Sequence, residues 1–146
     1  MSTTALQVLL VEDDPGDLLM TREALAQQPV SHDVHVARDG VEAMDFLRGP
    51  AAHPGPRADI VLLDLNLPRM SGREVLAEIR SDAALTHLPV VVLTTSSSGD
   101  DVLASYRLHA NAFVTKPSDY ARFADTVREI GRFFGEIAAL PRPAGA

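Results

Sequence analysis

Five short apolar segments alternate along the chain with stretches that have the periodicity of amphipathic helices. The segments are 6–11, 33–37, 58–63, 89–93 and 112–115. Those at 6–11, 59–63 and 89–93 are apolar at nearly every position, which is typical of parallel strands covered on both faces. The segment 33–37 alternates polar and apolar residues, as an edge strand does. This pattern predicts an α/β fold with a parallel sheet between two layers of helices.

Residues with capping side chains mark where the helices should begin. Asp14, Ser71, and either Ser118 or Asp119 each precede an amphipathic stretch. The chain therefore reads as five strand–helix units in succession. A length of 146 residues fits one domain with a single core, so we expect no second module.

Composition excludes several classes of function. Apolar residues make up 46% and charged residues 23% of the chain, and no apolar stretch approaches the roughly 20 residues that cross a bilayer. The absence of cysteine excludes disulfides, thiolate metal sites and cysteine nucleophiles. A net charge of -7 argues against nucleic-acid binding and favours a cationic ligand or a protein partner. The N-terminus is a poor signal peptide, so we expect a cytoplasmic protein with no membrane attachment.

Acids and hydroxyls follow three of the apolar segments. Asp64 comes directly after the run 60–63. The first segment ends in Glu12, Asp13 and Asp14, and the fourth ends in Thr94, Thr95 and Ser96. Because ligands of open parallel sheets bind beyond the carboxyl ends of the strands, we expect these side chains to share one site.

Carboxylates brought together in this way favour a hard divalent cation. Glu12, Asp13 and Asp64 would repel one another, and Mg²⁺ with oxygen ligands, including a carbonyl such as that of Asn66, relieves the repulsion. The same ion binds oxygens of an incoming phosphoryl group. The arrangement predicts a phosphoryl acceptor.

Two further residues can assist phosphoryl transfer to a carboxylate. Lys116 follows the fifth segment and can offset the negative charge, while Thr94 offers a hydroxyl donor. The alternative for Lys116 is that it is an ordinary surface lysine. The alternative for the hydroxyls of residues 94–96 is that they cap a helix before Ser98.

Five motifs together resemble a known family. They are Glu12-Asp13-Asp14, Asp64 with Leu65-Asn66-Leu67-Pro68-x-Met70-x-Gly72, Thr94-Thr95, Phe113 and Lys116-Pro117. Over residues of about 6–137 the chain is similar to the receiver domains of two-component response regulators. The resemblance implies a single receiver domain over 1–146 with a short extension at 138–146, and a doubly wound, flavodoxin-like five-stranded parallel sheet in the order 2-1-3-4-5.

The resemblance also implies roles for the residues that match. Asp64 would be phosphorylated, Asp13 would bind Mg²⁺ directly, Glu12 would bind it through water, and Asn66 would offer its backbone carbonyl. Such a protein is a phosphoacceptor that catalyses its own phosphorylation and dephosphorylation, and is not an enzyme acting on a separate substrate.

The remaining matches concern the phosphorylated state. Thr94 would bind a phosphoryl oxygen after activation and Lys116 would pair with the phosphate. Phe113 stands at the switch position of the family. It lacks a hydroxyl, so any switching must rest on packing, and a plain core role is the alternative.

The chain also departs from the family pattern. Thr95 replaces a common alanine, and Ser96 stands where a larger or charged residue is frequent. We therefore expect the phosphoryl group to have a different lifetime from that in a family member with an acid at the position of Ser96. Two competing interpretations stay open: a phosphohydrolase with an aspartyl-phosphate intermediate, which Asn66 disfavours because an acid is usual there, and a pseudo-receiver or flavodoxin-like binding module. The five histidines show no metal-ligand spacing and are assigned no role.

The last helical stretch predicts a dimer. Its apolar stripe is Phe123, Val127, Ile130, Phe134 and Ile137. From Asp119 to about Ala138 this helix would measure about 30 Å, whereas a five-residue strand spans about 17 Å, so the helix should overhang the sheet. Phe133 and Leu140 widen the stripe to one side. We therefore expect a homodimer through Phe133, Phe134, Ile137 and Leu140.

The chain most resembles the stand-alone response regulators that pair with bacterial phytochrome histidine kinases. The features that carry this resemblance are the overhanging helix, the Leu140-Pro141 ending and the stretch from Lys116 to Asp119. The resemblance implies that Asp64 takes phosphate from a phosphohistidine of a light-sensing kinase, a bacteriophytochrome, and that the signal leaves by protein–protein contact.

Overall fold

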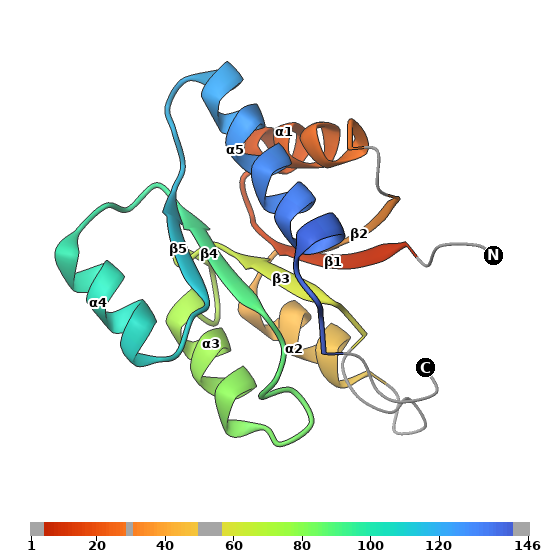
Figure 1. Ribbon diagram of the computed structural model, residues 1–146. Coiled ribbons are helices and arrows are strands. Elements are labelled where there is room, and N and C mark those ends of the chain that lie inside the picture. The colour runs from red at the N-terminus through yellow and green to blue at the C-terminus, as the bar shows by residue number, and fades with distance from the viewer. Residues whose placement is uncertain (1–4, 29–30, 50–56, 142–146) are drawn as a thin grey trace.

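A five-stranded parallel sheet forms the centre of the protein (Figure 1). The computed structural model describes residues 5–28, 31–49 and 57–141. The strands are β1 (Leu6–Val11), β2 (His32–Ala37), β3 (Ile60–Leu63), β4 (Val90–Thr94) and β5 (Ala112–Thr115). Their order is β2-β1-β3-β4-β5, and all neighbours run parallel. The predicted fold class and strand order are confirmed, and β2 lies at an edge as its alternation indicated.

Five α-helices cover the sheet. They are α1 (Pro15–Ala26), α2 (Gly40–Arg48), α3 (Gly72–Ser81), α4 (Gly99–Arg107) and α5 (Tyr120–Arg132). Helices α1 and α5 pack together on one face, while α2 and α3 lie on the other with α4 beside α3 (Figure 1). No helix in the described part of the chain is both long and apolar enough to span a bilayer.

Each central strand contributes to two separate cores. Leu9 and Val11 of β1 point into the core beneath α2 and α3, whereas Val8 and Leu10 point into the core beneath α1 and α5. The same alternation continues through β3 and β4, because successive side chains of a strand face opposite sides of the sheet. Burial on both sides explains why these runs are apolar at every position.

The predicted capping residues begin their helices as expected. The side chains of Asp14, Ser71 and Asp119 each accept a hydrogen bond from the backbone N–H three residues further on. Asp119, and not Ser118, caps α5. These caps fix the loops at the carboxyl ends of β1, β3 and β5, which is the edge of the sheet where the predicted site residues lie.

The C-terminal helix differs from the prediction. The α-helix ends at Arg132 and continues as a π-helical turn, Phe133–Ile137, in which the N–H of Ala138 donates to the carbonyl of Phe133 at 2.7 Å. The prediction of one regular helix to about Ala138 is therefore wrong in its last turn. A wider turn changes the phase of the apolar stripe, so Ile137 is 57% exposed although it continues the stripe in sequence. Of the predicted extension, residues 142–146 lie outside the described part.

Candidate phosphoacceptor site

The predicted site residues meet at the carboxyl edge of the sheet. Glu12 follows β1, Asp64 follows β3, Thr94 ends β4 and Lys116 follows β5. All four are buried, with exposed fractions of 8% or less. Four segments widely separated in the sequence therefore supply one cluster of polar side chains in an otherwise apolar interior.

Asp64 is held by hydrogen bonds to both carboxylate oxygens. The Thr94 hydroxyl donates to Oδ1 at 2.9 Å, the backbone N–H of Asn66 donates to the same oxygen at 3.1 Å, and Lys116 Nζ donates to Oδ2 at 3.0 Å. These donors fix the orientation of the carboxylate, the group that would act as the nucleophile. Lys116 is thus not a surface lysine, and Thr94 faces Asp64 instead of capping a helix.

Lys116 contacts more carboxylates than the sequence indicated. Its ammonium donates to Glu12 Oε1 in a short contact, to Asp17 Oδ2 at 2.8 Å and to Asp64 Oδ2 at 3.0 Å. Burial alone would lower the pKa of this ammonium, but its hydrogen bonds to Asp17 and Glu12 and the charge of Asp64 together raise it. Lys116 is therefore a cation at any physiological pH. Asp17, in the first turn of α1, is a residue that the sequence analysis did not assign to the site.

Glu12 is the most perturbed acid of the site. Its Oε2 accepts the backbone N–H groups of Asp13 and Asp14 at 3.1 and 3.2 Å. Burial, opposed by the hydrogen bond from Lys116 and reinforced by the charge of Asp64, raises the pKa of Glu12 to about 7 from its ordinary value of 4.5. Glu12 therefore changes charge near neutral pH, and a second cation close to it would favour the ionised form.

The chemistry of the donor set fits Mg²⁺. Glu12, Asp13 and Asp64 carboxylates with the Asn66 carbonyl would supply oxygen atoms only, as this ion prefers. Asp13 is exposed, so its side chain is free to turn toward an ion. Among the described residues no three acidic or histidine side chains already converge in metal-binding geometry, and Lys116 lies between Glu12 and Asp64. An ion at these residues would share their oxygens with the ammonium.

The loop after Asp64 is held in place by contacts that the sequence did not reveal. Arg69 has a left-handed backbone (φ 64°), and its guanidinium donates from Nε and Nη2 to the two oxygens of Asp39, each at 3.0 Å. Gly72 approaches this loop so closely that a Cβ atom there would lie 2.3 Å from the carbonyl oxygen of Asp64. The bidentate pair and the close approach fix the position of Asn66 relative to Asp64.

The hydrogen bonds of Ser96 and Phe113 go to residues other than Asp64. The Ser96 hydroxyl forms a short hydrogen bond to Asp101 at the start of α4, and Asp101 also pairs with Arg73 of α3. Phe113 is partly buried against the core, and its backbone N–H donates to the Tyr106 hydroxyl at 3.2 Å. The switch role of Phe113 stays a prediction.

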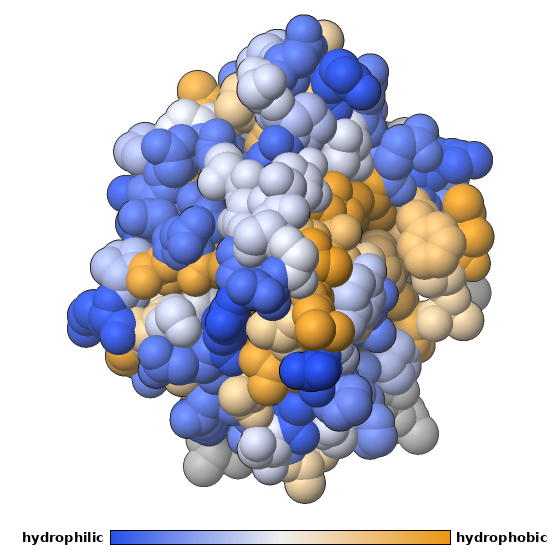
Figure 2. All heavy atoms as spheres, turned by 90° about the vertical axis from the view of Figure 1, so that its left-hand side faces the viewer, coloured by the Kyte–Doolittle hydropathy of each residue, from blue (hydrophilic) through white to orange (hydrophobic). Residues whose placement is uncertain are grey.

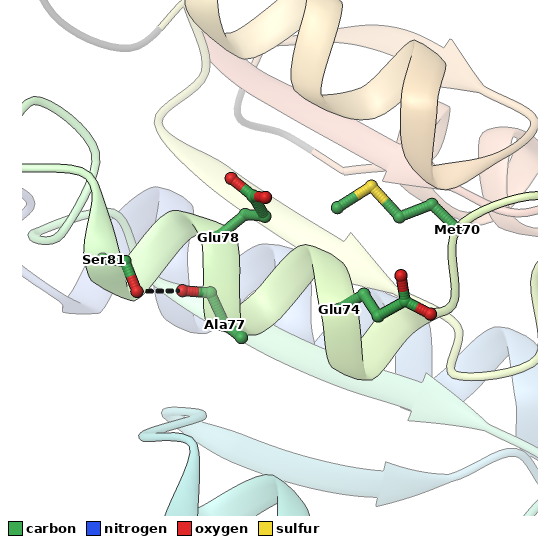
Figure 3. A pocket seen from close by; sticks show the side chains of 5 residues that line it. All are labelled: Met70, Glu74, Ala77, Glu78 and Ser81. Atoms are coloured by element: carbon green, nitrogen blue, oxygen red, sulfur yellow. Dashed lines mark hydrogen bonds between the residues drawn. The ribbon is translucent and has the colours of Figure 1, made fainter.

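A separate groove of about 310 Å³ runs along α3 (Figure 3). Met70, Glu74, Ala77, Glu78 and Ser81 line it, and the Ser81 hydroxyl donates to the Ala77 carbonyl at 2.8 Å. It contains none of the predicted phosphoacceptor or metal-binding residues.

The predicted dimer residues divide into two pairs. Phe133 and Ile137 are 48% and 57% exposed, whereas Phe134 and Leu140 are partly buried against the core beneath α1 and α5. The rings of Phe133 and Phe134 pack edge to face with centroids 5.0 Å apart. Only Phe133 and Ile137 of the four therefore offer substantial apolar surface.

Comparison with known proteins agrees with the geometry. The response regulator receiver domain matches residues 8–128. The chain is 44% identical over 135 residues, 92% of each protein, to the response regulator Rcp1 of Synechocystis sp. (strain ATCC 27184 / PCC 6803 / Kazusa). Crystal structures with similar folds include the phosphorylated cyanobacterial phytochrome response regulator RcpA (TM-score 0.89, 44% identity, 95% of this chain and 100% of that chain). The Mn²⁺-bound form of Rcp1 (TM-score 0.87, 43% identity, 94% and 99%) and the bacteriophytochrome response regulator AtBRR (TM-score 0.70, 40% identity, 96% and 100%) are also similar.

Proposed function

Because the chain belongs to the response regulator receiver family, we propose that Asp64 is the residue that accepts a phosphoryl group from a sensor histidine kinase. The observation that carries this assignment is the set of donors on Asp64: Thr94 and Asn66 on one oxygen, and Lys116 on the other. Such donors orient the carboxylate and lie where charge develops during phosphoryl transfer.

In the proposed reaction an Asp64 oxygen attacks the phosphorus of a phosphohistidine. The new O–P bond forms as the N–P bond breaks, and the imidazole nitrogen of the kinase leaves with the bonding electron pair. Lys116 and the Thr94 hydroxyl then redirect their hydrogen bonds from the carboxylate to phosphoryl oxygens. Mg²⁺, the cofactor of this family, supplies positive charge for the phosphoryl oxygens when bound, and we assign its ligands to Asp13, Asp64, the Asn66 carbonyl and, through water, Glu12.

Hydrolysis of the acyl phosphate by water restores the Asp64 carboxylate and releases inorganic phosphate. The chain therefore catalyses both its own phosphorylation and its own dephosphorylation under this proposal. A bacteriophytochrome is the kinase we propose, because several of the similar solved proteins are phytochrome or bacteriophytochrome response regulators. A cytoplasmic site of action fits this role and stays a prediction.

The decisive test is the intact mass after incubation with acetyl phosphate and Mg²⁺. We expect a gain of about 80 Da, one phosphoryl group, that disappears in Asp64→Asn or with a chelator. Asp45→Asn, which removes an exposed acid of α2, is the matched control and should still gain the group. If the folded wild-type protein neither gains mass nor binds beryllofluoride, it is a pseudo-receiver that acts by binding alone.

Signalling by surface contact requires exposed apolar groups near the site. On the face that carries α4, apolar patches lie among polar residues (Figure 2), and the exposed side chains of α4 include Leu103 and Tyr106. Tyr106 also contacts β5 through Phe113. We assign the contact with a downstream protein to this face, because α4 and β5 are both connected to the site. The loop before α4 follows Thr94, and β5 leads directly into Lys116.

We also propose a homodimer through the C-terminal region, carried by the exposure of Phe133 and Ile137 on consecutive turns. Sedimentation velocity of Phe133→Glu at micromolar concentration should show a shift from dimer to monomer. Leu19→Glu, a change at a side chain of α1 that is 59% exposed, is the matched control and should stay dimeric. An unchanged mass for Phe133→Glu would exclude Phe133 from the interface.

A further inference from the structure

Asp17 contacts the site without belonging to the proposed metal or phosphoryl ligands. It lies in the first turn of α1, and its Oδ2 accepts a hydrogen bond from Lys116 Nζ at 2.8 Å. A lysine ammonium has three N–H donors, and here they serve Glu12, Asp17 and Asp64. The ammonium therefore has no donor left over in this state.

A metal ion and the Lys116 ammonium compete for the same oxygens. Two of the three acceptors of Lys116, Glu12 and Asp64, are also proposed ligands of Mg²⁺. Binding of the ion must weaken at least one of these contacts, because the ion draws the carboxylate oxygens toward itself. Until a phosphoryl group arrives, Asp17 is the one acceptor of the three that the ion leaves to the ammonium.

We propose that Asp17 is a positioning residue that retains the Lys116 ammonium at the site while Glu12 and Asp64 turn to the metal ion. The inference rests on the proposed phosphoacceptor role of Asp64. With Asp17 present, the ammonium keeps one fixed partner and stays within reach of the phosphoryl oxygens. Without it, Lys116 must either hold Glu12 and Asp64 against the ion or lie near the ion without a partner.

The local structure holds both partners firmly. The Asp14 side chain caps α1 by accepting the backbone N–H of Asp17 at 2.8 Å, which fixes the backbone that carries the carboxylate. On the other side, the Lys116 N–H donates to the Thr94 carbonyl at 2.7 Å. The side chains of Asp17 and Lys116 are 22% and 4% exposed, so the pair is largely screened from water. Contacts of this kind contribute more than an exposed ion pair does.

The sequence provides a direct probe, because Lys116 is its only lysine. Protein labelled with ¹⁵Nζ-lysine gives one side-chain ammonium signal in a ¹H–¹⁵N spectrum. In the wild-type protein this signal should shift but persist on addition of Mg²⁺ alone, with no phosphoryl group or phosphoryl analogue to serve as a partner. In Asp17→Asn it should broaden or vanish under the same conditions, since an ammonium without a fixed partner exchanges its protons with water.

Metal affinity supplies the second measurement, made by following free Mn²⁺ by electron paramagnetic resonance. Asp17→Asn should weaken Mn²⁺ binding about tenfold, the loss of about 1.4 kcal/mol expected for one charge-assisted hydrogen bond. Asp14→Asn is the matched control: it removes the same charge from the same helix start, an asparagine still caps the helix, and affinity should fall by no more than about twofold. In a Lys116→Met background, Asp17→Asn should change affinity by only about twofold, because its effect passes through Lys116.

The outcomes separate this inference from the proposed function. An Asp17→Asn protein with wild-type Mn²⁺ affinity and a persistent ammonium signal would overturn the positioning role. So would an equally large effect of Asp17→Asn with and without Lys116, since Asp17 would then act on the ion directly. If the wild-type protein itself binds no Mn²⁺, the proposed metal site fails first, and the role of Asp17 fails with it.

Discussion

Replacement of Lys116 by methionine should destabilise the metal-free protein and at the same time tighten its binding of divalent ions. The ammonium is the shared partner of Glu12, Asp17 and Asp64, and its side chain is 4% exposed. Removing one member of a buried ionic cluster typically costs about 3–5 kcal/mol, because the remaining charges are left unpaired. Protonation of Glu12 relieves part of this, so we expect about 3 kcal/mol at pH 8.

For a domain of this size, about 3 kcal/mol corresponds to a melting temperature lower by roughly 10 °C. The assay is thermal unfolding with excess chelator and again with saturating Mg²⁺. Magnesium should restore much of the lost stability in Lys116→Met, because the ion replaces the missing positive charge and stabilises the folded state by an amount that grows with the logarithm of the ion concentration above its dissociation constant. Mn²⁺ titration should show tighter binding than in the wild-type protein, since no ammonium competes for Glu12 and Asp64.

The control is Arg107→Met, which makes the same kind of change at an exposed cation in the last turn of α4 and should leave metal affinity unaltered. Unchanged stability of Lys116→Met in chelator would refute the inference that the ammonium holds the acids together. Weaker Mn²⁺ binding in this variant would refute the competition between the two cations.

Three further predictions concern other residues of the site. Because the folded pKa of Glu12 is about 7 and its ordinary value is 4.5, folded protein binds a proton that unfolded protein has lost, so metal-free stability should fall by at most about 3 kcal/mol as the pH rises from 4.5 to 7. Glu12→Gln should remove this fall, as measured by urea unfolding at several pH values; an unchanged slope would contradict the assignment. Ser96→Glu should alter the dephosphorylation rate measured by loss of the phosphoryl mass, since it replaces a hydroxyl tied to Asp101 by an acid; an identical rate would count against a role for this position. Gly72→Ala should cost about 1–3 kcal/mol in thermal unfolding and slow phosphorylation, since its Cβ would lie 2.3 Å from the Asp64 carbonyl, whereas Gly99→Ala, with no atom within 4 Å, should be tolerated.

The sequence predicts most of this site because of a general property of parallel sheets. Side chains that follow neighbouring parallel strands must meet at one edge, so Asp64, Thr94 and Lys116 could be placed together from the apolar runs alone. The fold class followed from the same runs, since only strands buried on both faces are apolar throughout.

Contacts that depend on a particular helix rotation or loop conformation could not be predicted in this way. Asp17 and Lys116 are 99 residues apart, and their meeting depends on the angle at which α1 packs beside α5. Arg69, which pairs with Asp39, has a left-handed backbone that nothing in the surrounding sequence indicates. The π-helical turn at Phe133 was missed for a related reason, because the apolar stripe continues in sequence through a change of helical pitch.

The contacts on Asp64 also indicate a route by which the proposed phosphorylation would change the surface of the protein. Both Thr94 and Lys116 donate hydrogen bonds to the Asp64 carboxylate itself, so a phosphoryl group attached to Asp64 must displace or extend these bonds. Thr94 leads directly into the loop before α4. Within the helix α4 itself, Ser105 is the buried residue and the other residues are at least partly exposed. A helix held by so few buried side chains moves at little free-energy cost. We therefore expect α4, with its exposed Leu103 and Tyr106, to respond to Asp64 before the more deeply packed helices do.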